Sequence, residues 1–107
     1  MTQSFEELAS LDRVIHEPAR LVIMTALSGC ESADFLFMQR LTGLTKGNLS
    51  SHLSKLEEAG LINIVKQFKG KIPNTMLGLT PKGRDAIKQH WDQLDQLRKK
   101  AGKWKLI

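Results

Sequence analysis

Hydrogen-bonding and basic side chains are concentrated between positions 45 and 55 of this 107-residue chain. Amides and hydroxyls can contact the edges of DNA bases, and a lysine ammonium group can contact a phosphate. We therefore expect base contacts from Asn48, Ser51 and His52, and phosphate contacts from Lys46 and Lys55. The full candidate set is Thr45, Lys46, Asn48, Ser50, Ser51, His52 and Lys55. The alternative is a solvated helix face that binds nothing.

An amphipathic helix would present these side chains together. Leu49, Leu53 and Leu56 recur at positions i, i+4 and i+7, which predicts one narrow apolar stripe on a helix over about 45–59. Thr45 is a suitable N-cap, because its hydroxyl can accept a backbone N–H of the first turn. The first-turn N–H groups are also suited to a phosphate. A glycine follows the helix, at position 60, where a positive φ is common.

A basic hairpin is expected directly after this helix. Leu61–Val65 alternates and is rich in branched residues, which predicts a strand, and Met76–Leu79 can form the return strand. Between them, Lys69–Asn74 is rich in turn residues. The three lysines of this hairpin are Lys66, Lys69 and Lys71, and we expect them to contact phosphates, with the minor groove as a candidate place of contact. Lys69 and Lys71 alternate, so they can share one strand face; the alternative role is a charged edge that prevents sheet-to-sheet aggregation.

The remaining periodic segments predict further helices. Proline at position 18 suits a first helical turn, Asp34 suits an N-cap, and Thr80-Pro81 combines both signals. The predicted helices lie over about Phe5–Ile15, Ala19–Leu27, Phe35–Leu41 and 81–100. A helix-turn-helix followed by a two-stranded hairpin is a winged helix. The chain is thus predicted to be α+β and mainly helical, with one domain over 1–107, a wing over about 61–79 and flanking terminal helices.

The terminal helices carry more apolar surface than one small domain can cover. Two apolar rows are expected to pair with those of a second subunit and form a twofold dimer. The residues of these rows are Leu8, Leu11, Ile15, Ile87, Trp91, Leu94 and Leu97. The alternative is that both rows pack within the monomer.

Composition limits the class of protein. The net charge of +5 is uneven: residues 60–107 hold 11 Lys and Arg against 3 Asp and Glu, which favours an anionic partner such as nucleic acid. No apolar run approaches the roughly 18 residues that span a bilayer, and the acidic, polar start MTQSFEELAS is unlike a signal peptide. The single Cys30 cannot form an internal disulfide. We therefore expect a cytoplasmic protein.

Three motifs together resemble the winged-helix regulators related to the MarR and ArsR repressors. They are the pattern T-x-G-x-L-S-x-H-L-x-x-L-E-x-x-G-L from position 45, the hairpin with Lys and Gly at its tip, and L-T-P-K-G from position 79. The resemblance spans about residues 11–97. It implies a homodimer that binds pseudo-palindromic operator DNA and blocks or modulates transcription.

The chain departs from the metal-sensing repressors. It has no Cys-x-Cys motif, and His16, His52 and His90 are far apart in sequence, so we expect no metal and no cofactor. No nucleophile–base pattern, phosphate loop or carboxylate pair indicates an enzyme. The leading prediction is a dimeric DNA-binding regulator, and the alternative is a winged-helix module that binds protein without specific DNA binding. The operator, any effector, and the roles of Cys30 and Trp104–Ile107 stay open.

Overall fold

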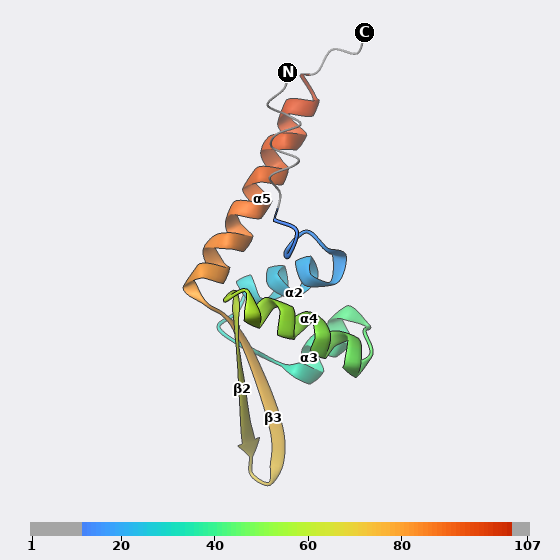
Figure 1. Cartoon of the computed structure of the whole chain (residues 1–107), viewed down its shortest axis with the longest axis vertical. Coiled ribbons are helices and arrows are strands. Elements are labelled where there is room, and N and C mark those ends of the chain that lie inside the picture. Colours follow the sequence, from blue (N-terminus) through green and yellow to red (C-terminus); the bar gives the residue numbers. More distant parts are fainter. Residues whose placement is uncertain (1–11, 104–107) are drawn as a thin grey trace.

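The computed structural model describes residues 12–103. Its elements are α2 (Pro18–Ser28), β1 (Ala33–Asp34), α3 (Phe35–Thr42), α4 (Lys46–Glu58), β2 (Ile62–Lys69), β3 (Ile72–Leu79) and α5 (Pro81–Ala101). Helices α2, α3 and α4 gather around the base of the β2–β3 hairpin, while the hairpin and α5 project toward opposite ends (Figure 1). The predicted α+β winged-helix class is confirmed. Of the helix expected over Phe5–Ile15, residues 5–11 lie outside the described residues, and Arg13–Ile15 form a turn.

Side-chain caps fix where the helices begin. The hydroxyl of Thr45 accepts the backbone N–H of Asn48 at 3.1 Å, and the hydroxyl of Thr80 accepts that of Gly83 at 2.9 Å. Asp34 caps α3 in the same way, so the three predicted caps are confirmed. Each satisfies an N–H group that has no partner within its helix. Glu17, which the sequence did not single out, caps α2 by accepting the amides of Ala19 and Arg20.

The hairpin is longer than the sequence predicted. Strands β2 and β3 pair antiparallel from Ile62↔Leu79 to Lys69↔Ile72, so the turn contains only Gly70 and Lys71. Positive φ at Gly70 (67°) permits such a two-residue turn. The prediction of a loop over Lys69–Asn74 was therefore wrong, because this turn lets the strands pair up to Lys69 and Ile72. For the same reason Lys69 and Lys71 do not share a strand face.

A third strand, also unpredicted, extends the sheet. The two residues of β1 pair with Leu77 and Met76 of β3, which gives the strand order β1-β3-β2. Because β1 leads directly into α3, this pairing ties the start of α3 to the hairpin. Two residues are too few to show the period-2 pattern by which strands are recognised in a sequence.

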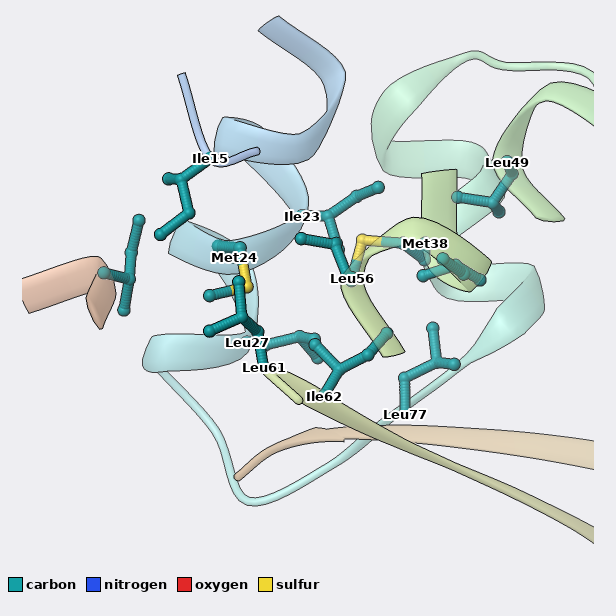
Figure 2. Close-up of a cluster of buried hydrophobic side chains, with 12 residues drawn as sticks. Ile15, Ile23, Met24, Leu27, Met38, Leu49, Leu56, Leu61, Ile62 and Leu77 are labelled. Atoms are coloured by element: carbon teal, nitrogen blue, oxygen red, sulfur yellow. The ribbon is translucent and has the colours of Figure 1, made fainter. Parts of the chain in front are cut away.

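The core lies where α2, α4 and the base of the hairpin meet. Ile23, Met24 and Leu27 of α2 face Leu56 of α4, and Leu61 and Ile62 lie below them (Figure 2). Leu49 and Leu53 of α4 are buried as well, which confirms the predicted apolar stripe of this helix. Within the described residues, none of the helices has both the length and the apolar character needed to cross a bilayer.

Two residues predicted to lie at a dimer interface belong to this core instead. Ile15 is 0% exposed and Ile87 is 1% exposed in the single chain. A side chain that is already covered cannot bury more apolar surface against a second subunit. The prediction was wrong for Ile15 and Ile87, because the turn before α2 and the second turn of α5 both face the monomer core.

Candidate nucleic-acid interface

The outer face of α4 carries most of the predicted contact residues. Asn48, Ser50, Ser51 and Lys55 are all exposed. The buried leucines on the other side of the helix hold this face away from the core. Small and polar side chains therefore cover a rigid helix surface that solvent can reach, as an element entering a major groove requires.

The N-terminal turn of α4 is suited to an anion. Thr45 caps Asn48, and the first backbone hydrogen bond of the helix runs from the amide of Leu49 to the carbonyl of Thr45 at 2.9 Å. The amides of Lys46 and Gly47 precede that bond, so they point out of the end of the helix. Together with the exposed ammonium group of Lys46, they form a positive end that favours a phosphate.

A groove joins α4 to the hairpin. This open cavity of about 820 Å³ is lined by α3, by one flank of α4 and by both strands. Three of the predicted contact residues meet there: Lys46 and Ser50 from α4, and Lys66 from β2. Gln39 of α3 and Asn74 of β3 also line the groove and were not predicted, because their place depends on how the elements pack. The rest of the lining is largely apolar and includes Glu57, so the groove has an apolar floor between two lysines, one on the helix and one on the hairpin.

The other two hairpin lysines lie at its tip. Lys69 ends β2, Lys71 lies in the turn, and both are exposed on either side of Gly70. The tip is the part of the hairpin farthest from the helices (Figure 1). Lys69 and Lys71 are therefore not part of the groove, and they can reach only a partner that extends well beyond α4.

His52 is placed differently from the prediction. Its Nδ1 lies 3.1 Å from Nη1 of Arg20 and 3.5 Å from Oε2 of Glu17, and its side chain is only 21% exposed. Burial opposes ionisation of Glu17, but hydrogen bonds from the amides of Arg20 and Ala19, together with electrostatic interactions with the neighbouring His52 and Arg20 side chains, outweigh it and lower the pKa of this carboxyl. His52 therefore links α4 to the start of α2 rather than lying on the open face.

The apolar residues of α5 beyond the core are the remaining dimer candidates. Trp91 is 44% exposed, with its indole N–H donated to the hydroxyl of Thr25 at 2.8 Å, and Leu94 and Leu97 are half-buried. Leu8 and Leu11 lie outside the described residues.

Two histidines that are distant in sequence come together where the segment before α2 meets α5. His16 Nδ1 lies 3.2 Å from His90 Nε2, and His90 is buried. Burial lowers the pKa of His90, and the nearby His16 lowers it further. His52 is elsewhere, and within residues 12–103 no cluster of three or more His, Cys, Asp or Glu side chains could hold a metal ion.

Comparison with known proteins gives a consistent result. The family model described as a winged helix DNA-binding domain matches residues 19–98. The chain is 35% identical over 88 residues to an uncharacterized protein of Methanocaldococcus jannaschii, covering 81% of this chain and 95% of that protein. It is also 35% identical over 60 residues to the HTH-type transcriptional regulator YgaV of Escherichia coli K12, covering 56% and 61% of the two chains.

Solved structures share the fold. A transcriptional regulator homologue from Pyrococcus horikoshii OT3 is 30% identical and superimposes with a TM-score of 0.83, over 94% of this chain and 98% of that chain. A regulator described as of the MarR family, from Enterococcus faecalis V583, is 21% identical with a TM-score of 0.68, over 95% and 87% of the two chains.

Proposed function

The chain belongs to the family of winged helix DNA-binding domains, and from this premise we propose that it is a dimeric, sequence-specific repressor of transcription that acts in the cytoplasm as a single domain over 1–107. The observation that carries the proposal is the groove in which Lys46 and Ser50 of α4 meet Lys66 of β2. The ammonium groups of Lys46 and Lys66 are suited to phosphates on either side of a major groove that receives α4.

Helix α4 enters the major groove in this proposal. Its exposed face is small and polar, so the helix backbone can approach the base edges closely. Asn48, Ser50 and Ser51 contact bases, and an Asn amide is suited to adenine. Lys46, Lys55 and the capped first turn at Thr45 contact the flanking phosphates, which set the register of the helix but carry no sequence information.

The wing contacts the DNA backbone beside the major-groove site. Lys66 lies in the groove next to α4, whereas Lys69 and Lys71 lie farther out at the tip. These positions allow Lys66 to meet a phosphate close to the recognition helix and the other two lysines to meet phosphates farther along the duplex. Each neutralised phosphate releases a counterion, so binding weakens as salt rises.

The second subunit pairs through the terminal segments. Trp91, Leu94 and Leu97 form an apolar row on α5 that lies beyond the covered core residue Ile87. In the proposed dimer the two copies of α4 lie on one side of the duplex about one helical turn apart, the spacing that two half-sites require. Such a dimer occludes two half-sites of an operator, which excludes polymerase by occupancy and requires no cofactor.

Selection from a pool of random duplexes tests this function. We expect a pseudo-palindrome with half-sites about 10 base pairs apart, bound with a strong salt dependence. Sedimentation at micromolar concentration should give a dimer, and Trp91→Ala with Leu94→Ala should shift it to a monomer. If no sequence is enriched and genomic fragments are not bound, the chain is a winged-helix module that binds protein instead.

A further inference from the structure

The tip of the wing exposes apolar side chains among its lysines. Phe68 is 71% exposed and Ile72 is 70% exposed, the two highest values among the large hydrophobic side chains of the described residues. Both lie within two residues of Gly70, and Lys69 and Lys71 lie beside them. Lysines at a sheet edge discourage pairing with another sheet. That role does not explain why two large apolar side chains are exposed beside them.

The register places the two apolar side chains on opposite faces of the hairpin. Phe68 pairs with Pro73, on the face that carries Ile62 and Leu77 nearer the core. Ile72 pairs with Lys69 on the other face, because successive strand residues point to opposite sides. The tip is therefore apolar on both faces and basic at its end.

Because the hairpin tip is apolar on both faces, only some partner surfaces can cover both faces at once. A flat partner surface contacts one face of a hairpin and leaves the other in water. An element inserted into a narrow cleft is contacted on both faces at once. The lysines beside the tip further require a cleft with anionic walls, and the minor groove of DNA is such a cleft, with phosphates along both edges.

We propose that the wing tip is an apolar wedge that enters the minor groove beside the α4 site, with Phe68 pressed against a base step. The proposal rests on the DNA-binding function proposed above. Lys69 and Lys71 contact phosphates of the two strands, and Ile72 with Pro73 widens the wedge. The minor groove is about 6 Å wide, little more than the strand spacing of about 4.8 Å. The groove must therefore open around the tip, and apolar insertion that partly unstacks a step opens and bends the duplex.

The test measures bending and unstacking of the selected operator. The duplex carries a fluorophore pair at its ends for energy transfer, or 2-aminopurine in the step that flanks each half-site. The wild-type protein should raise both energy transfer and 2-aminopurine fluorescence. Phe68→Ala should remove most of both signals and weaken binding about tenfold, while the slope of affinity against salt stays unchanged because the net charge is the same.

Two control variants separate the wedge from other effects. Val65→Ala truncates an exposed apolar residue farther from the tip (51% exposed), and it should leave bending and affinity as in the wild type. Lys69→Ala with Lys71→Ala should reduce the salt slope, which Phe68→Ala does not. The exposed positions of these residues allow every variant to fold, and circular dichroism with thermal unfolding checks this.

Three results would overturn the wedge. Operator binding by the wild type without bending or a 2-aminopurine signal would refute it and leave the proposed function standing. So would Phe68-dependent binding to anionic phospholipid vesicles with operator affinity unchanged in Phe68→Ala. Failure of the wild type to bind any selected duplex would refute the proposed function itself, and the wedge with it.

Discussion

A β-carbon on Gly83 would overlap the carbonyl oxygen of Leu61 and lie 2.8 Å from its carbonyl carbon, so the first turn of α5 lies directly against the residue that leads into β2. The amide of Thr80 donates to the same carbonyl at 3.1 Å, and its hydroxyl donates to the carbonyl of Gly60 at 2.7 Å. This packing fixes the end of α4, the start of β2 and the start of α5 relative to one another. It therefore sets the angle between α4 and the β2–β3 hairpin, and it gives a structural reason for the L-T-P-K-G motif.

Replacing Gly83 with alanine should destabilise the fold strongly. The added methyl group meets backbone atoms of Leu61 that cannot rotate away, so α5 has to shift. We expect the free energy of unfolding to fall by about 3 kcal/mol, the upper range for overpacking. Urea denaturation followed by circular dichroism measures it.

Gly47 supplies a matched control. A β-carbon at Gly47 would have nothing within 4 Å, and Gly47 lies within α4 at an ordinary φ. Gly47→Ala should therefore stabilise the fold by about 0.5 kcal/mol, since alanine loses less backbone entropy in a helix. Equal effects of the two substitutions would show that the clash at Leu61 is relieved without cost.

Substitutions on the open face of α4 should alter sequence preference. If Asn48 and Ser51 contact bases, Asn48→Ala or Ser51→Ala should weaken operator binding by about 1–3 kcal/mol and relax selectivity at one position of each half-site. Binding to random DNA should change little. Repeating the random-pool selection with each variant measures this, and an unchanged selected motif would contradict base contact.

Substitutions at the wing tip should act on all sequences alike. Lys69→Ala with Lys71→Ala should weaken operator and random DNA by similar factors and reduce the slope of log affinity against log salt by about 2, roughly one for each phosphate that is no longer neutralised. Lys88→Ala with Lys103→Ala removes the same charge from exposed positions on and just after α5. If this control lowers the slope equally, net charge rather than the wing is responsible.

His90 should make stability depend on pH. Its pKa is lowered from 6.5, first by burial and then by His16. The unfolded chain therefore binds a proton at a higher pH than the folded chain does. The part of the unfolding free energy that depends on neutral His90 is fully present above about pH 6.5. It is lost as the pH falls through the window between 6.5 and the lowered pKa.

A substitution at His90 tests whether this residue causes the pH dependence of stability. His90 Nδ1 is buried, with no hydrogen-bond partner among the described residues, so His90→Leu removes a titrating group without breaking a bond at that atom. The variant should show a flatter profile of unfolding free energy between pH 7 and about pH 5. His16→Gln should flatten it only in part. A His90→Leu profile parallel to that of the wild type would assign the pH dependence to other groups.

Sequence patterns predicted the features that depend on neighbouring residues. The leucine stripe of α4, the caps Asp34, Thr45 and Thr80, and the turn at Gly60, with φ of 75°, were all correct. These features arise from helical periodicity and from side chains two or three residues from the amides they cap. The predicted relation to winged-helix DNA-binding proteins is also confirmed.

The features that were missed depend on interactions between distant parts of the chain. The turn at Gly70 proved tighter than its composition indicated, because the pairing of Lys69 with Ile72 extends both strands. Ile15 and Ile87 have the periodicity of an exposed apolar row, yet both are buried in the core cluster of the single chain. His52 has a polar neighbourhood in sequence, but its partners are 32 and 35 positions away, so no local pattern shows them.

Substituting His52 tests whether this residue holds two helices together, as its contacts in the structure indicate, or contacts a base, as the sequence predicted. Arg20 donates to His52 Nδ1, and Glu17 lies beside both, so His52 holds α4 against the start of α2. We expect His52→Ala to reduce the free energy of unfolding by about 1 kcal/mol, because the half-buried guanidinium is left without this hydrogen-bond acceptor. Operator and random DNA should be bound more weakly by similar factors, and the selected motif should be unchanged.

Ser51→Ala is the natural comparison for His52→Ala, since Ser51 is the adjacent residue on the open face of α4. It should change the selected motif and leave the unfolding free energy within about 0.5 kcal/mol of the wild-type value. Arg20→Ala should lose more stability than His52→Ala, because Arg20 also donates to the carbonyl of Val14 and pairs with Glu17. The double variant should lose less than the sum, because both substitutions remove the Arg20–His52 hydrogen bond. An altered motif with unchanged stability in His52→Ala would instead show that His52 leaves Glu17 and Arg20 to contact a base.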